Sequence, residues 1–214
     1  MISKTNKPVL FLDFDGLKFD TIDSHRDYVN EKYGIATTRN DYVDNNHNLT
    51  DVIKKYLPKE EHASIIAEQV YADIGENLNA SIERSMNLVP IDGMCEVMPL
   101  LAEKYELWTV TARQKSSLEV IQYLLTKHVP NCVSGIHCVW DHIGDYKFLS
   151  HSKKDFIAKF EGEKVAFIDD SLSEILEMQD VVPAYLFDPA KRHIDHPLVQ
   201  HRVISWEEIR KVFL

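Results

Sequence analysis

Five short apolar runs, separated by stretches with helical spacing, constrain the fold of this chain more than any other feature. The runs are residues 9–13, 106–111, 135–140, 164–169 and 184–188. Each is continuously apolar, which is typical of parallel strands that helices cover on both faces. Patterns typical of helices lie between the later runs, at residues 93–105, 114–128, 152–160 and 171–180. The sequence therefore predicts an α/β fold with a doubly wound parallel sheet of about five strands.

Residues 19–90 interrupt this alternation. No run in the segment is typical of a strand, and apolar residues recur at helical spacing in SHRDYVNEKYG, LTDVIKKYL and EEHASIIAEQVYADIGENL. Pro90 and Gly93 supply breaks where the segment ends. We therefore expect a helical domain of residues 19–90 inserted into a core domain of residues 1–18 and 91–214.

The net charge of the chain limits the classes of partner that we expect it to bind. With 24 Lys and Arg against 34 Asp and Glu, the 214 residues carry a formal net charge of −10. Such a surface repels phosphodiester backbones and anionic membranes, so we expect neither nucleic acid nor membrane partners. A small phosphorylated ligand remains possible, because a local pocket can carry the opposite charge. No signal peptide or membrane-spanning run is recognisable and the three cysteines form no CxxC, so we expect a cytoplasmic protein.

Acidic and hydroxyl side chains end three of the predicted strands. Asp13 and Asp15 end the first, Thr111 ends the second, and Asp169 and Asp170 end the fourth. Ligands of an open parallel sheet collect at the carboxyl ends of its strands, so these groups are expected to meet. Crowded carboxylates repel one another unless a cation lies between them, and a set of oxygen ligands that also accepts phosphate favours Mg²⁺.

This arrangement suits phosphoryl transfer. A carboxylate beside a metal ion can attack phosphorus and form an acyl-phosphate on the enzyme. A second carboxyl group two residues further on can protonate the leaving oxygen and then activate the water that clears the intermediate. Gly16 lets the chain turn sharply after the two acids, at a φ that most residues avoid.

The sequence resembles the haloacid dehalogenase-like hydrolase superfamily, in its phosphatase branch with a type-1 helical cap. Asp13-Phe14-Asp15-Gly16, Thr111, a lysine near residue 153 and the pair Asp169-Asp170 resemble the four ordered motifs of this superfamily. DFDGLKFDT aligns without a gap with the common family sequence DFDGTLFDT. The resemblance covers essentially the whole chain, because residues 19–90 fall where the family places its cap.

The resemblance implies a role for each matched residue. Asp13 is expected to be the nucleophile and a metal ligand. Asp15 is expected to be the general acid and base, with its backbone carbonyl also reaching the metal. Thr111 would hold the transferring phosphoryl group through its hydroxyl. Asp170 is the preferred further metal ligand, and Asp169 would orient the metal site or the lysine.

Three basic residues leave alternatives open. Lys153 fits the family spacing best as the active-site lysine, but its neighbour Lys154 could serve instead. Arg113, in the stretch VTAR, resembles nucleotidase-like and acid-phosphatase-like branches and is expected either to bind the substrate phosphate or to form a structural salt bridge. Leu17 and Lys18 depart from the common family sequence. Lys18 lies at the entry to the cap, where it would either meet an anionic substrate or reach solvent, and we expect exposure to solvent.

These residues predict a Mg²⁺-dependent phosphomonoester hydrolase that acts on a small metabolite through an aspartyl-phosphate. Two alternatives are a phosphotransferase such as a sugar phosphomutase, which would use the same motifs, and a non-catalytic binding protein on the same scaffold. Nucleoside monophosphates are suggested by analogy with VTAR and the cap type, and sugar phosphates stay open. The sequence does not determine the oligomeric state.

Overall fold

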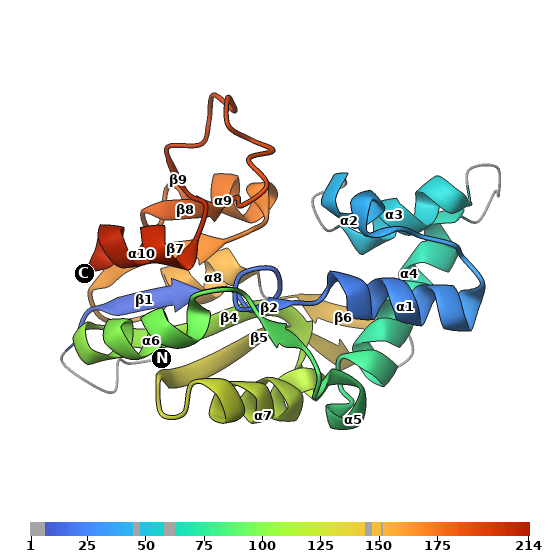
Figure 1. Cartoon of the computed structure of the whole chain (residues 1–214), viewed down its shortest axis with the longest axis horizontal. Coiled ribbons are helices and arrows are strands. Elements are labelled where there is room, and N and C mark those ends of the chain that lie inside the picture. The colour runs from blue at the N-terminus through green and yellow to red at the C-terminus, as the bar shows by residue number, and fades with distance from the viewer. Residues whose placement is uncertain (1–6, 45–47, 58–62, 144–146, 151) are drawn as a thin grey trace.

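The core of the molecule is a seven-stranded sheet in the order β6-β5-β4-β1-β7-β8-β9 (Figure 1). The structure is a computed structural model that describes residues 7–44, 48–57, 63–143, 147–150 and 152–214. The strands are β1 (Val9–Leu12), β4 (Glu106–Gln114), β5 (Val133–Ile143), β6 (Lys147–Ser150), β7 (Lys164–Asp169), β8 (Ala184–Phe187) and β9 (His201–Val203). Neighbouring strands run parallel, except that β6 is antiparallel to β5.

The predicted α/β fold is confirmed, and all five predicted strands are present as β1, β4, β5, β7 and β8. The sequence analysis did not predict the two edge strands β6 and β9. Neither is a continuously apolar run, because β6 (KFLS) begins and ends in polar residues and β9 (HRV) contains a single apolar residue.

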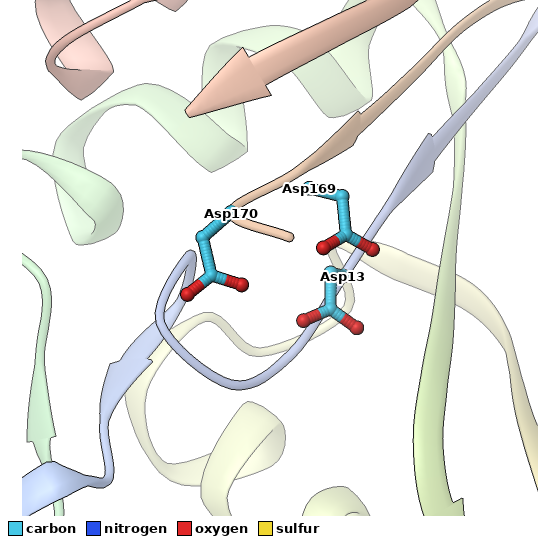
Figure 2. A group of neighbouring side chains, drawn as sticks. All are labelled: Asp13, Asp169 and Asp170. Atoms are coloured by element: carbon cyan, nitrogen blue, oxygen red, sulfur yellow. The ribbon is translucent and has the colours of Figure 1, made fainter. Parts of the chain in front are cut away.

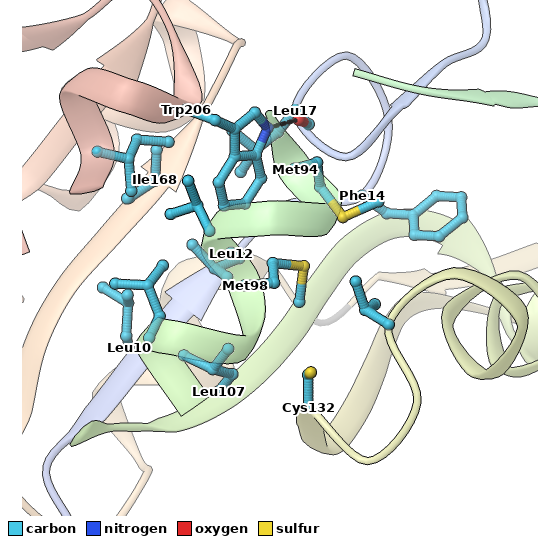
Figure 3. Packing of buried hydrophobic residues seen from close by; sticks show 14 of the residues in the cluster. Leu10, Leu12, Phe14, Leu17, Met94, Met98, Leu107, Cys132, Ile168 and Trp206 are labelled. Carbon is cyan, nitrogen blue, oxygen red and sulfur yellow. Dashed lines mark hydrogen bonds between the residues drawn. The ribbon is translucent and has the colours of Figure 1, made fainter. Parts of the chain in front are cut away.

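Two layers of helices cover the sheet, which explains why its strands are continuously apolar. Leu10 and Leu12 of β1 pack on one face, in a cluster with α6, α7 and α10 (Figure 3). Val9 and Phe11 pack on the other face, in a cluster with α8 and α9. Side chains alternate across a strand, so both sets must be apolar. These helices are α6 (Met94–Lys104), α7 (Leu118–His128), α8 (Lys153–Ala158), α9 (Leu172–Met178) and α10 (Trp206–Phe213), with the 3₁₀ turn η2 (Lys115–Ser117) before α7.

In the sequence, a helical insertion follows β1 and precedes the other strands of the sheet. In space, it lies beyond the carboxyl end of β1 (Figure 1). It consists of α1 (Ile22–Tyr33), α2 (Arg39–Asp44), α3 (Leu49–Tyr56), α4 (Ala63–Asp73), the π-helix η1 (Ile74–Leu78) and α5 (Ile82–Ser85). The antiparallel pair β2 (Phe19–Asp20) and β3 (Val89–Pro90) joins its two ends. These strands were not expected, because two residues give no periodic pattern.

The insertion has a hydrophobic cluster of its own, centred on buried residues such as Val29, Val52 and Ile53. Residues 45–47 and 58–62 of the predicted helical segment, and residues 1–6 of the predicted core, lie outside the described residues. In the described part of the chain, no helix has both the length and the apolar character required to cross a membrane.

Candidate active site

Three carboxylates from two neighbouring strands meet at the carboxyl edge of the sheet (Figure 2). Asp13 follows β1, Asp169 ends β7 and Asp170 comes next, and β1 and β7 are paired in parallel. One oxygen from each carboxylate lies within 4.8 Å of the others, and all three residues are buried. The strand order thus brings together acids that are more than 150 residues apart in the sequence.

The turn after β1 aims Asp13 at this cluster. Gly16 has φ +67°, in the left-handed region, and its amide donates to the Phe19 carbonyl. A Cβ at this position would lie 2.0 Å from Oδ2 of Asp170. Glycine is therefore required at this position for two reasons: its backbone conformation is left-handed, and the carboxylate of Asp170 lies where a Cβ would be.

Lys153 lies between two of the acids. Its Nζ donates to Oδ1 of Asp13 at 2.8 Å and to Oδ2 of Asp169 at 2.7 Å, and its side chain is 3% exposed. Lys154 instead pairs with the exposed Asp180. Of the two candidate lysines, the structure places Lys153 in the site and Lys154 outside it.

The site carries more negative charge than its lysine balances. Burial raises the pKa of Asp13 well above its usual value, and the neighbouring Asp169 raises it further. Burial likewise raises the pKa of Asp169 to about 7. Burial acts to lower the pKa of Lys153, but Asp13 and Asp169 outweigh it and raise that pKa. Three carboxylates beside the ammonium group of Lys153 form a set of oxygen ligands whose charge a divalent cation would neutralise.

The donors of the cluster suit a hard cation. Asp169 already uses both oxygens, since Oδ1 accepts from the Ser171 amide at 2.8 Å and Oδ2 accepts from Lys153. This leaves Asp13 and Asp170 better placed to be direct ligands, with Asp169 fixing the lysine. The residues therefore fit Mg²⁺, which prefers a few carboxylates and keeps positions for water and phosphate.

Asp15 is held by Arg113 in a bidentate ion pair. Nε of Arg113 lies 2.9 Å from Oδ2 of Asp15 and Nη2 lies 2.8 Å from Oδ1, while the guanidinium stacks 4.8 Å from the centre of the Phe14 ring. Burial acts to raise the pKa of Asp15, but Arg113 outweighs it and lowers that pKa. Of the two roles expected for Arg113, this structure displays the salt bridge.

Thr111 lies at the predicted edge of the sheet but is fully buried. Its hydroxyl oxygen accepts a hydrogen bond from the backbone amide of Arg113 at 3.2 Å. In this structure the hydroxyl bonds within the last residues of β4, where the pairing with β5 shifts register between Thr111 and Gln114, and it does not line the pocket described below.

The expectation that Lys18 is exposed to solvent is wrong. Lys18 is completely buried, and its Nζ donates to the backbone carbonyls of Leu12 and Asp13. Burial lowers the pKa of Lys18 to about 7. The common family sequence has leucine at this position, which was a signal for burial. Lys18 thus fixes the backbone that carries Asp13.

A pocket of about 520 Å³ opens over the acids, between the sheet and the helical insertion. The sheet side contributes Asp13, Asp15, Arg113, Lys153, Asp169 and Asp170, with neighbours that include Gln114 and Glu174. We call the side formed by the insertion the distal wall, and it consists of Thr21, Ile22, His25, Tyr42, Asn48, Leu49, Asp51, Tyr71, Ile74, Gly75 and Asn79. The sequence analysis did not identify these residues, because helical periodicity shows which faces pack but not which polar groups turn toward a neighbouring domain.

Solved structures resemble this chain over nearly its whole length. A haloacid dehalogenase-like hydrolase from Streptococcus pneumoniae matches with a TM-score of 0.67 and 13% identity, covering 98% of this chain and 99% of the other. The HAD-hydrolase candidate YfnB from Bacillus subtilis, bound to magnesium, matches with a TM-score of 0.61, 16% identity and coverage of 98% and 99%. A phosphoglycolate phosphatase candidate from Lactobacillus delbrueckii matches with a TM-score of 0.64 and 14% identity, and the match covers 98% of each chain.

No protein-family model matches the chain, and no curated protein matches it in sequence. At 13–16% identity, the structural likeness shows the fold. The fold is that of the haloacid dehalogenase-like hydrolases, as the sequence resemblance implied.

Proposed function

We propose that this chain is a Mg²⁺-dependent phosphomonoester hydrolase that transfers the phosphoryl group of a small soluble substrate to Asp13 and then to water. One observation carries the proposal. Three buried carboxylates and Lys153 converge at the base of a pocket that is large enough for a small organic phosphate. This combination of nucleophile, cation site and enclosed space is what phosphoryl transfer requires.

Asp13, Asp170 and the backbone carbonyl of Asp15 would hold the metal ion. When bound, Mg²⁺ would neutralise the charge that accumulates on the transferring phosphoryl group. Asp169 would act on the site through Lys153 and the Ser171 amide.

In the first step, a carboxylate oxygen of Asp13 attacks phosphorus while the bond from phosphorus to the ester oxygen breaks. The alcohol oxygen takes its proton from Asp15, which must therefore be protonated at that moment. Arg113 holds Asp15 ionised in this structure. The substrate phosphate offers Arg113 another anion, so we propose that Arg113 moves to the phosphate and that Asp15, released from the ion pair, takes up a proton from solvent before it donates.

In the second step, Asp15 accepts a proton from water as the water oxygen attacks the phosphorus of aspartyl-phosphate. The acyl-phosphate bond breaks, inorganic phosphate leaves, and Asp13 is restored as a carboxylate. Asp15 is again protonated for the next cycle, so the net reaction is ester plus water giving alcohol plus phosphate. Lys153 stays within hydrogen-bond distance of Asp13 and offsets its charge before attack.

The helical insertion would act as the cap of this site. We propose that residues 19–90 form a cap domain over a core of residues 1–18 and 91–214. The cap excludes bulk water during phosphorylation of Asp13, which strengthens every electrostatic interaction inside the pocket. The distal wall supports this role, because its residues line the same pocket as the acids.

The first test is hydrolysis of p-nitrophenyl phosphate with Mg²⁺ and with a chelator. We expect hydrolysis that depends on Mg²⁺, its loss in Asp13→Asn, and normal rates in Asp180→Asn, which alters an exposed acid outside the site. A rate that the chelator leaves unchanged, or activity retained in Asp13→Asn, would contradict the proposal. Transfer of the phosphoryl group to a sugar phosphate instead of water would identify a phosphotransferase.

A further inference from the structure

The charges around the pocket are distributed unevenly. Among the described residues that line it, the Lys and Arg side chains are Lys153 and Arg113, which lie at the phosphate end and pair with the acids there. Among its described residues, the distal wall contributes no Lys or Arg, but it contributes the carboxylate of Asp51. Within the described part of the pocket, a second anionic group on the substrate would therefore face a carboxylate and no lysine or arginine.

The same region offers hydrogen-bonding groups for an uncharged ligand. Nε2 of His25 lies 3.2 Å from Oδ1 of Asn79, and both residues belong to the distal wall. Asn48 caps α3 with its Oδ1, which accepts from the Asp51 amide, so its NH₂ group is not used in that bond. Amide and imidazole groups of this kind bind hydroxyl groups without requiring a charge.

Gln114 adds a donor at the junction between the sheet and the insertion. The side chain is 4% exposed and lines the pocket, and its Nε2 has no hydrogen-bond partner among the described residues. It lies against Gly75 of η1, where a Cβ would be 2.4 Å from Nε2. A buried N–H group without an acceptor is unfavourable, and an oxygen of a bound ligand would satisfy it.

The size and apolar surface of the pocket complete the description of the ligand. A volume of about 520 Å³ leaves room for a ring beyond the phosphate group. Ile22, Leu49 and Ile74 present apolar side chains to this space. A sugar or nucleoside would bury its ring carbons against them while its oxygens met the polar groups.

We propose that the site selects phosphomonoesters whose leaving group is an uncharged, hydroxyl-bearing alcohol of sugar or nucleoside size, and discriminates against substrates with a second anionic group. The inference rests on the proposed function and specifies its substrate class. Asp51 and Gln114 are the specificity residues that it assigns, Asp51 by repelling anions and Gln114 by donating to a ligand oxygen.

Glycerol 3-phosphate and 3-phosphoglycerate test the charge selectivity directly. They share a three-carbon skeleton, and a hydroxymethyl group in one replaces a carboxylate in the other. We expect kcat/KM to be at least about tenfold higher for glycerol 3-phosphate, and higher again for ribose 5-phosphate or a nucleoside 5′-monophosphate. Equal or faster hydrolysis of 3-phosphoglycerate would overturn the inference.

A binding measurement distinguishes a failure of the proposed selectivity from a failure of the proposed catalytic function. The same compounds are titrated calorimetrically into Asp13→Asn with Mg²⁺ present. Tighter binding of glycerol 3-phosphate supports the selectivity even if the wild type hydrolyses nothing, in which case the proposed function alone fails. Equal binding, or tighter binding of 3-phosphoglycerate, overturns the selectivity.

Two substitutions test whether Asp51 and Gln114 determine the substrate selectivity. Asp51→Lys should shift the ratio of the two kcat/KM values toward 3-phosphoglycerate by about tenfold, because it replaces a repelling charge with an attracting one. Glu68→Lys makes the same charge change on an exposed part of α4 outside the pocket and should leave the ratio unchanged. Gln114→Leu should raise KM for ribose 5-phosphate more than for p-nitrophenyl phosphate. Equal ratios in both lysine variants, or an equal rise in KM for both substrates, would overturn these assignments.

Discussion

Substitution of Gly16 by alanine separates the backbone requirement at this position from the active-site requirement. The chain offers a matched control, because Gly34 has nearly the same φ, +65° against +67°, and no described atom lies within 4 Å of the Cβ it would gain. The Cβ of Gly16→Ala would instead lie 2.0 Å from Oδ2 of Asp170. Both variants therefore strain the backbone, but only Gly16→Ala displaces a proposed metal ligand.

The expected magnitudes follow from this geometry. A left-handed alanine costs about 1 kcal/mol, which lowers Tm by roughly 2–4 °C in a chain of this size. Ordinary van der Waals contact begins at 3.4 Å, so Oδ2 of Asp170 must move by about 1.4 Å, the difference between 3.4 and 2.0 Å. Cγ of Asp170 would also lie only 2.5 Å from the new Cβ, so rotating the carboxylate is not enough and the whole side chain must move. Mg²⁺ tolerates little departure from its preferred geometry, and a misplacement of about 1 Å can lower a rate about 100-fold.

The assay pairs thermal unfolding with the dependence of p-nitrophenyl phosphate hydrolysis on Mg²⁺ concentration. We expect a fall in Tm in both variants that is larger in Gly16→Ala, a loss of kcat of about 100-fold in Gly16→Ala only, and a higher Mg²⁺ requirement in that variant. If Gly16→Ala keeps kcat within about threefold of the wild type, or if Gly34→Ala loses as much, then the proposed role of Asp170 beside Gly16 is refuted.

Three further predictions concern the lysine, the buried acids and the turn after β1. Lys153→Met should lower kcat by about 100-fold, because it removes the buried ammonium group that pairs with Asp13. Lys154→Met, which alters an exposed pair, should keep kcat within about twofold of the wild type. Equal rates of the two variants in steady-state assays would contradict this. Burial raises the pKa of Asp169 to about 7, so this acid ionises as the pH rises through that value. Calorimetric titration should show Mg²⁺ affinity rising roughly tenfold from about pH 6 to about pH 8, and a flat profile would show that the ionisation of Asp169 does not control Mg²⁺ binding. Trp206→Phe removes the 2.8 Å hydrogen bond from Nε1 to the Leu17 carbonyl (Figure 3) and should lower the free energy of unfolding by about 1–3 kcal/mol in denaturant titrations. An unchanged midpoint would show that this bond does not stabilise the turn.

The strands of the core and the acids at their ends were predictable because both depend on short-range patterns. A continuous apolar run indicates a strand buried on two faces, and the parallel arrangement then brings the residues after each run to one edge. Asp13, Asp169 and Asp170 meet in the structure for this reason. The edge strands β6 (KFLS) and β9 (HRV) lack such a continuous apolar run.

The side-chain partners were not predictable to the same degree. Which anion Arg113 meets depends on rotamers, and the structure gives it Asp15. The burial of Lys18 depends on a turn that folds its side chain back beneath Asp13. The distal wall depends on how the insertion docks on the sheet, through contacts such as that of Gly75 with Gln114, which no local pattern of either segment encodes.

Mass spectrometry of the enzyme quenched during turnover tests the central claim most directly, since the claim is that Asp13 itself accepts the phosphoryl group. With substrate and Mg²⁺, the peptide that contains Asp13 should gain the mass of one phosphoryl group, and fragmentation should place that group on Asp13. The gain should disappear in Asp13→Asn and when Mg²⁺ is chelated. Rapid hydrolysis with no phosphorylated peptide at any quench time, or a phosphoryl group on another residue, would contradict the account.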